Sequence, residues 1–535
     1  MKTKITIAVI LMLILCTGSM TFAQDRSSVV PYKNLSSPVY GTDVIMLNDP
    51  AQNQTKTAIS VASNGWLYSC LAVGSGGYYV MRSVDDGQTW TSSAIQYPDY
   101  IFTNLDIVVT GNDVSSFQVF VAYTCFSIAD PLSWYANINE FNSDFSSFIF
   151  HTLENSYTSY GYGGIKIATD YHYPASGSSP FSLGVILTRN TGADSKAIYY
   201  VSTDGGFSFT MQEIFATTAY FFSKVSIAYA RSYTYNTGRY FMAFQMSSGW
   251  LAENGWIALY YTSNNVTPPI TGIGTWGIED LRNPSIVCQF NDLDNSNGEF
   301  TVILFVEKDM SGGTGTAYDL LGYYNKTPLT NMYAFTEFPI SSSSANTIQP
   351  DANFDPGYNN FLLTYCELEA QKLLYKVNSQ ELTDPADWTT ISAGYNDQAN
   401  LLNPWPKVEI NPVKLQVAHV WTANPGLANG IALFDAEYSV VGMEESNNHN
   451  ALSHFVYPNP TKDKATISLI LNEAGPVKIA LFNVFGKKVM EIDRKNIAAG
   501  QCLTDIDMKN LPAGYYLYEI TTTSGISSGR VILER

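Results

Sequence analysis

The sequence has little that could hold a disulfide framework or a structural metal. Six cysteines occur in 535 residues, and the five that follow the N-terminal apolar run are irregularly spaced, with no C-x-x-C pair. Five histidines are present, and no C-x-x-C pair accompanies them to complete a zinc site. Cysteines in this pattern are expected to be buried thiols that pack as small hydrophobic side chains. No cofactor is therefore expected.

Charge and long apolar runs are also scarce. Charged residues make up 14% of the chain, and 47 acidic residues outnumber 29 basic ones, which gives a formal net charge of −18. Such an acidic chain is a poor partner for nucleic acid or for anionic lipid. Beyond the N-terminus no stretch reaches the ~18 consecutive apolar residues that a transmembrane helix needs, so no such helix is expected.

The N-terminus has the pattern of an export signal. Two lysines precede an apolar run over residues 5–15, and residues 21–23 (Thr-Phe-Ala) supply the small side chains that a signal peptidase recognises. We predict a signal peptide over residues 1–23, cleaved before Gln24. Attachment as a lipoprotein through Cys16 is disfavoured, because a bulky leucine precedes that cysteine where a small residue is expected.

What the chain has in abundance is aromatic, strand-forming sequence that repeats. It contains 36 Tyr, 28 Phe and 9 Trp, residues that favour strands. One apolar, strand-like segment recurs, with copies roughly 50–65 residues apart and further strand-like segments on both sides of each copy. The seven copies lie at residues 65–73, 117–127, 181–189, 238–246, 298–307, 360–367 and 414–421.

Four strands per repeat, without helical periodicity, predict an all-β fold in which residues 24–441 form a seven-bladed β-propeller. Six or eight blades are the alternatives. The last repeat lacks an outer strand of its own. Residues 39–47 are expected to supply that strand and close the ring, which would hide an otherwise exposed sheet edge.

Two turns share the pattern Ser-x-Asp-x-Gly-x-Ser/Thr-aromatic. In such a turn the aspartate accepts hydrogen bonds from nearby backbone N–H groups, and the glycine adopts a positive φ at little cost. The pattern resembles the Asp-box (BNR repeat) of sialidase-like propellers. The resemblance implies a structural role at the turn for Ser83, Asp85, Gly87, Trp90, Ser202, Asp204, Gly206 and Phe209.

The C-terminal part of the chain differs from the repeats. Residues 442–452 are polar and without pattern, which predicts a linker. From residue 453 to 535, short strands alternate with turns, as expected for a small Ig-like β-sandwich. This segment contains Tyr-Pro-Asn-Pro, Val-Phe-Gly-Lys and Leu-Pro-Ala-Gly-Tyr motifs in that order, with key positions Pro458, Asn459, Pro460, Gly486 and Gly514.

The ordered motifs resemble the type A C-terminal sorting domain of the type IX secretion system. Asn483 and Asp463 stand where the family often has Asp and Gly. The resemblance implies that the chain leaves the periplasm of a Gram-negative bacterium through the type IX machinery. It also implies that the protein is then released or anchored to surface lipopolysaccharide.

The predicted propeller offers few candidates for catalysis. A sialidase needs three arginines to clamp a carboxylate, and the Arg-Ile-Pro motif of that family is missing near the first repeat; Arg282-Asn283-Pro284 is the nearest equivalent. No pair of carboxylates could be assigned to a glycosidase mechanism either, so catalytic residues are unknown. The ligand-binding candidates are an acidic, aromatic loop and two strand-end arginines: Asp170, Tyr171, His172, Arg189 and Arg231.

Residues 291–299 are rich in oxygen ligands and allow two interpretations. Asp292 and Asp294 could bind Ca²⁺, but the glycine of the segment is one place late for an EF-hand loop. A solvated turn is the favoured interpretation.

These observations predict an exported propeller that binds an extracellular glycan or protein ligand without chemistry. A sialidase-like glycoside hydrolase and a non-catalytic adhesion or surface-structure component are the alternatives. Fold alone does not decide among them.

Overall fold

The structure is a computed structural model, and it describes residues 43–49, 52–74, 76–111, 116–170, 181–232, 237–250, 252–264, 266–289, 300–312, 314–328, 331–341, 346–355, 360–378, 388–390, 394–396, 401, 404–411, 416–424, 429–438, 454–457, 461–471, 474–483, 487–498, 500–523 and 525–533. The chain divides into two compact units, Met1–Ser439 and Val440–Arg535. Within the described ranges no helix has the length and hydropathy needed to span a bilayer. The predicted signal peptide and linker lie outside these ranges.

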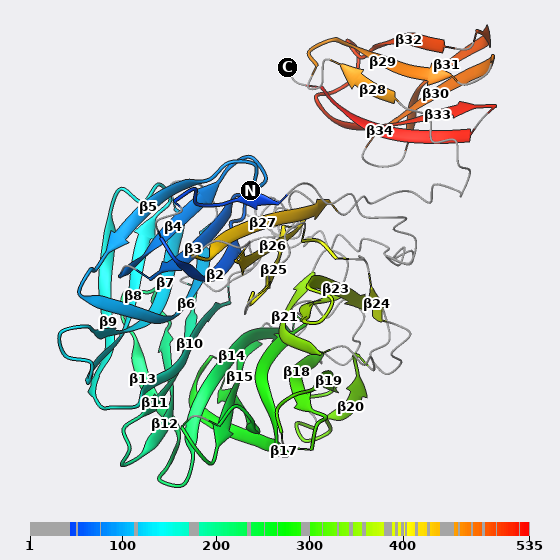
Figure 1. Cartoon of the computed structure of the whole chain (residues 1–535). Helices are drawn as coiled ribbons and strands as arrows, with labels where there is room; N and C mark the ends of the chain where they lie inside the picture. The colour runs from blue at the N-terminus through cyan, green and yellow to red at the C-terminus, as the bar shows by residue number, and fades with distance from the viewer. Residues whose placement is uncertain are drawn as a thin grey trace, which may run out of the picture. The chain divides into compact units, whose positions relative to one another are not determined.

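The first unit is a β-propeller built from antiparallel sheets that follow one another in chain order around a central axis (Figure 1). The first three sheets are β2 (Gln54–Val61), β3 (Leu67–Val73), β4 (Gly77–Ser83) and β5 (Thr91–Gln96); β6 (Tyr100–Thr110), β7 (Gln118–Ser127), β8 (Ser133–Asn142) and β9 (Phe148–Tyr157); and β10 (Gly161–Thr169), β11 (Leu183–Asn190), β12 (Ser195–Ser202) and β13 (Thr210–Thr217).

A seven-stranded sheet follows, in which the 22-residue strand β17 pairs with β16 through its first part and with β18 through its last part. Its strands are β14 (Phe221–Ser232), β15 (Thr237–Ser247), β16 (Gly255–Asn264), β17 (Thr267–Cys288), β18 (Val302–Asp309), β19 (Tyr318–Asn325) and β20 (Thr336–Pro339). Because β17 joins two four-stranded units into one sheet, the blade count of seven stays a prediction.

The last propeller sheets combine both ends of the unit. They are β21 (Thr347–Asp355), β22 (Asn360–Glu367), β23 (Lys372–Asn378) and β24 (Trp388–Thr390); and β25 (Lys407–Asn411), β26 (Gln416–Ala423), β27 (Ile431–Tyr438) and β1 (Val44–Ile45). Val44 pairs with Phe434 and Ile45 with Leu433. An N-terminal strand therefore supplies the outer strand of the last sheet, as the sequence predicts.

We call β2, β6, β10, β14, the last part of β17, β21 and β25 the inner strands. Each contacts the next, and β25 contacts β2, so the ring is closed. The strands beside them are buried on both faces; every residue of β3 and β26 is buried. This burial explains the continuous apolar runs in the sequence. All five described cysteines are buried thiols, and none forms a disulfide.

Both Asp-box turns are held by the same hydrogen bonds. In the first turn, Gly87 N donates to Ser83 Oγ (2.8 Å) and Thr89 N donates to Asp85 Oδ1 (2.9 Å). Partial burial would raise the pKa of Asp85, but the hydrogen bonds from Thr89 and Ser83 outweigh it and the pKa is lowered. The second turn repeats the same contacts, with lengths of 2.6–3.0 Å, among Ser202, Asp204, Gly206 and Ser208.

The glycines of these turns allow close packing against the preceding sheet. A Cβ atom on Gly87 would lie 1.9 Å from Phe434 of β27, and one on Gly206 would lie 2.5 Å from Phe120 of β7. Trp90 also packs edge-on against Phe434, with ring centroids 5.4 Å apart. Each turn therefore joins two neighbouring sheets.

Replacing Asp204 by alanine should lower the unfolding free energy of the propeller by about 1–2 kcal/mol, because the turn loses three hydrogen bonds to a carboxylate. The check is urea unfolding followed by tryptophan fluorescence, since all nine tryptophans lie in the propeller. As a control, Asp144→Ala removes a carboxylate from a simpler turn that accepts from Ser146 N, and it should shift the urea midpoint less. An Asp204→Ala midpoint equal to that of the parent would contradict the structural role.

The second unit is a sandwich of two antiparallel sheets, which confirms the predicted fold. One sheet contains β28 (His454–Tyr457), β29 (Lys464–Leu471) and β32 (Gly500–Asp507); the other contains β31 (Lys488–Ile497), β30 (Gly475–Asn483), β33 (Gly514–Thr522) and β34 (Gly525–Leu533). Their facing side chains, among them Ile467, Ile479 and Tyr518, form the core. Gly514 opens β33 with a φ of 148°, whereas Pro458, Asn459, Pro460 and Gly486 lie outside the described residues.

Candidate functional site

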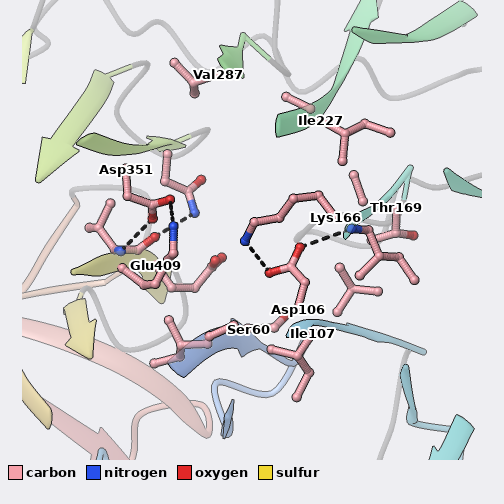
Figure 2. A pocket seen from close by; sticks show the side chains of 18 of the residues that line it. Ser60, Asp106, Ile107, Lys166, Thr169, Ile227, Val287, Asp351 and Glu409 are labelled. Carbon is pink, nitrogen blue, oxygen red and sulfur yellow. Dashed lines mark hydrogen bonds and ion pairs between the residues drawn. The ribbon is translucent and has the colours of Figure 1, made fainter. Parts of the chain in front are cut away.

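The inner strands surround a central channel that contains a cavity of about 250 Å³ (Figure 2). All seven inner strands contribute to its wall, at residues 58–63, 106–109, 166–169, 226–229, 285–288, 351–354 and 407–410. The wall carries two lysine–aspartate ion pairs and one further carboxyl group, that of Glu409.

The two ion pairs have the same construction and link neighbouring inner strands (Figure 2). Asp106 accepts from Lys166 Nζ (2.8 Å) and from Ile167 N (3.1 Å). Asp351 accepts from Lys407 Nζ (2.5 Å) and from Val408 N (3.0 Å). Serine hydroxyls replace the carboxylate on two other inner strands, where Ser60 accepts from Val109 N and Ser226 from Ile286 N. These contacts hold the ring together.

The charges in the channel wall balance one another. Burial acts to lower the pKa of Lys166, but the Asp106 carboxylate outweighs burial and the pKa is raised. Burial lowers the pKa of Lys407, although Asp351 opposes it. Burial, and then the charge of Asp351, raises the pKa of Glu409 to about 8, so Glu409 is mostly neutral at pH 7. The wall therefore offers no excess charge to a ligand.

The inner strands all run in the same direction, because each begins a unit of four antiparallel strands and three strands separate it from the next inner strand. Their N-terminal ends therefore share one face with the loops that connect the second and third strands of each sheet. We call this the mouth face. The Asp-box turns connect third and fourth strands, β4 to β5 and β12 to β13, and so lie on the opposite face.

Strained backbone marks the mouth face. Lys224, Asn283, Gln349 and Trp405 have φ values of 36°, 49°, 57° and 44°. The first three lie where the pairing register shifts, each at the beginning of an inner strand: β14, the last part of β17 and β21, respectively. Trp405 lies two residues before β25. Positive φ is unusual for residues other than glycine, and such strain is concentrated at ligand-binding and catalytic sites.

A buried ion pair occupies part of this face. Glu307 is 0% exposed and accepts from Arg282 Nε, Asn283 Nδ2 and Gln349 N, each at 2.6 Å. Arg282 also donates to Glu253 (2.7 Å), and its guanidinium lies 3.4 Å from the ring centroid of Tyr318. Burial raises the pKa of Glu307, although Arg282 and the hydrogen bonds oppose that shift. This network joins two successive inner strands, β17 and β21, through Glu307 of β18.

An aromatic patch lies on the same face, and we define it as Tyr160, Tyr220, Phe221, Trp250 and Trp256. Tyr160, Phe221 and Trp250 form a mutual cluster with ring centroids 5.2–6.1 Å apart. Tyr220 lies 5.2 Å from Trp256. Tyr220 is exposed and the other four are half-buried, so the rings present apolar faces to solvent.

The structure separates the ligand-binding residues that the sequence suggested. Asp170 follows β10, is 3% exposed and accepts from Ser182 N (2.7 Å). Arg189 pairs with Tyr162 at the other end of that sheet and forms an ion pair with Glu154 of β9. Arg231 lies in β14, and its side chain is not described. Tyr171, His172, Asp292 and Asp294 lie outside the described residues, and those that are described contain no cluster of three metal-ligating side chains.

Sequence reasoning missed the residues of the mouth face. A signal was present: Asn283-Pro284, Gln349-Pro350 and Trp405-Pro406 recur at the start of three successive inner strands. Proline at the first residue of a strand marks an interrupted ladder. The recurrence could have located the mouth of the channel before the structure was known.

Comparison with known families identifies the second unit. Residues 455–534 match the secretion system C-terminal sorting domain family. The chain ends in a type IX sorting domain. This domain directs export, so the protein is secreted or displayed at the cell surface of a Gram-negative bacterium, and the type IX machinery is a partner. No curated protein matches the sequence.

Solved structures with similar folds are distant. A protein of unknown function from Dyadobacter fermentans is 11% identical, with a TM-score of 0.40, and the match covers 76% of this chain and 100% of that chain. The BP39L lectin from Burkholderia pseudomallei is 12% identical, with a TM-score of 0.46 and coverage of 73% and 97%. A Trypanosoma rangeli sialidase is 10% identical, with a TM-score of 0.36 and coverage of 92% and 87%. Likeness at this level does not transfer binding or activity.

Proposed function

We propose that the exported propeller is a non-catalytic carbohydrate-binding protein, and that a glycan docks on the aromatic patch of the mouth face. The observation that carries the proposal is the cluster of Tyr160, Phe221 and Trp250, beside the exposed Tyr220. A sugar ring has an apolar face that packs against aromatic rings and hydroxyls that bond to polar groups at their edges, which suits tyrosine and tryptophan.

The carboxylates beside this patch favour binding over hydrolysis. A glycosidase needs two carboxyl groups that flank the scissile bond, with one of them free to reach it. Glu307 is fully buried and its oxygens accept three hydrogen bonds, and Glu253 is paired with Arg282. These acids support the propeller rather than offer an acid and a nucleophile to a substrate.

We also propose the boundaries of the exported protein. The mature chain begins at Gln24, the propeller extends to residue 441, and residues 442–452 link it to the sorting domain at 453–535. The propeller acts outside the cell, either released or attached to surface lipopolysaccharide.

The test is equilibrium binding of the purified mature chain to an immobilised glycan panel, followed by titration of the best glycan. Replacing Trp250 by alanine should weaken binding by about tenfold, because a central aromatic contact is lost. Phe207→Ala is the matched control, because Phe207 is 84% exposed but belongs to the second Asp-box turn on the opposite face. The glycan affinity of this variant should equal that of the parent.

Two outcomes would contradict the proposal. One is the failure of every glycan to bind the folded parent protein, which would favour a structural surface component. The other is the release of fluorophore from a panel of fluorogenic glycosides at a rate that Glu307→Gln abolishes, which would make the protein a hydrolase.

A further inference from the structure

Two lysines, Lys56 and Lys224, lie at the mouth of the channel. Lys56 of β2 donates to Thr103 O and to Asn104 Oδ1 (3.5 Å) on the next inner strand. Lys224 is exposed and lies 4.7 Å from the ring centroid of Trp405. In the described part of the chain no carboxylate lies within ion-pair distance of either ammonium, whereas Lys166, Arg282 and Lys407 each have such a partner.

The two lysines act on each other electrostatically. Burial, and then the positive charges of Lys224 and Lys166, lower the pKa of Lys56 to about 7. Burial also lowers the pKa of Lys224, although Glu307 opposes it. Neighbouring like charges are unfavourable unless a counter-charge lies between them. Glu307 and Glu253 act on Lys224 only from beyond ion-pair distance.

The backbone at this position is strained. Lys224 is the extra residue where the β14–β15 register shifts between Ser223 and Val225. Trp405 has a φ of 44°, an outlier for a bulky residue. Its amide donates to Gln349 Oε1 (2.8 Å), and prolines flank it on both sides. The indole and the ammonium of Lys224 are thus held side by side at the channel mouth.

We propose that Lys56, Lys224 and Trp405 form a subsite for the anionic group of an acidic carbohydrate, a carboxylate or a sulfate ester. The inference rests on the proposed function, and it specifies the ligand class. The anion lies between the two ammonium groups, which donate charge-assisted hydrogen bonds to it. The sugar that carries the anion stacks on the indole of Trp405. Residues 220–224 connect this subsite to the aromatic patch, since they carry Tyr220, Phe221 and Lys224.

A purely structural role for the lysines makes a different prediction. Arg282 is a structural cation whose charge is compensated by Glu307 and Glu253 and by the ring of Tyr318. Removing such a cation lowers stability. Removing Lys56 from beside Lys224 relieves repulsion, so the Lys56→Met variant is expected to unfold at a urea concentration equal to or above that of the parent.

The test compares three probes on the mature chain by isothermal titration calorimetry at pH 6.0: trigalacturonic acid, a sulfated κ-carrageenan tetrasaccharide and neutral galactotriose. At least one acidic probe should bind about tenfold more tightly than galactotriose, and its affinity should fall with added NaCl, since salt screens charge. Lys224→Met should weaken acidic binding by about tenfold and the Lys56→Met/Lys224→Met double variant by about thirtyfold or more, with galactotriose unchanged.

Lys196→Met is the matched control, because Lys196 is on the outer part of the propeller and is paired with Glu213 (2.8 Å); it should leave all three affinities unchanged. Equal affinity for acidic and neutral probes would overturn the subsite while leaving the carbohydrate-binding proposal intact. An equal loss of affinity for the acidic probe in the Lys196→Met and Lys224→Met variants would also overturn the subsite. Failure of all three probes and of the wider glycan panel would instead remove the proposed function on which the subsite rests.

Discussion

Replacing Arg282 by methionine should lower the unfolding free energy of the propeller by about 3–5 kcal/mol at neutral pH. The guanidinium is the only described cation that contacts Glu307, and that carboxylate is fully buried. Without Arg282, only the hydrogen bonds from Asn283 and Gln349 offset the free-energy cost of burying the charge of Glu307. An uncompensated buried charge is among the largest single sources of destabilisation.

The pH dependence and a double variant identify the cause. The difference in unfolding free energy between the parent and Arg282→Met should shrink as pH falls, because Glu307 can then take up a proton and become neutral. In the Arg282→Met/Glu307→Gln double variant most of the stability should return, since both charges are gone. Urea unfolding followed by tryptophan fluorescence measures each value.

Arg239→Met is the matched control for Arg282→Met. Arg239 donates to the carbonyl oxygens of Thr262 and Ser263 and lies over Tyr261, but among the described residues it has no buried acid as partner. The Arg239→Met substitution should lower the unfolding free energy by about 1 kcal/mol. Equal losses from the two arginine variants, or a double variant less stable than Arg282→Met, would contradict the assignment of Arg282 as the counter-charge of Glu307.

Acidification should destabilise the propeller through His419. This side chain is 0% exposed in β26 and stacks on Tyr395, with ring centroids 4.1 Å apart. Burial lowers its pKa from the model-compound value of 6.5 to about 3. Between these two pH values the unfolded chain binds a proton that the native protein does not, so stability is fully present above pH 6.5 and falls as pH decreases. The loss should reach about 2–3 kcal/mol at pH 4.5.

The measurement is the unfolding free energy of the parent and of His419→Phe from pH 7.5 to pH 4.5. Carboxylates contribute to both curves, but the difference between the curves isolates the histidine. Phenylalanine keeps a planar ring beside Tyr395, and any cost of its larger size appears already at pH 7.5, where the histidine is neutral in both states. The parent should lose about 2–3 kcal/mol more than the variant on acidification. Parallel curves would show that His419 is protonated in the native state or is not buried.

The sequence predicts those parts of the structure that are local or repeated. Strand-forming segments, the turns that begin at Ser83 and Ser202, the closing strand from the N-terminus and the sandwich all follow from patterns within short windows. The sorting domain follows from an ordered set of motifs. These features depend on backbone hydrogen bonds and on alternation of side chains, which neighbouring residues determine.

The site depends on residues that approach one another only when the ring closes. Lys56 and Lys224 lie on the first and fourth inner strands, and Trp405 precedes the last, so no window of sequence contains them together. Asp170 and Arg189 show the opposite error: they are close in sequence, but β10 and β11 place them at opposite ends of one sheet. Likewise, nothing around His419 or Glu307 in the sequence predicts complete burial of an ionisable side chain.

The most direct measurement is a crystal structure of the mature protein with the acidic oligosaccharide that binds it best. The account predicts an uncleaved saccharide on the mouth face, with a sugar ring against Trp250 or Tyr220 and its anionic group between the ammonium groups of Lys56 and Lys224. A saccharide bound to the Asp-box face or to the sandwich, with the mouth face empty, would contradict it.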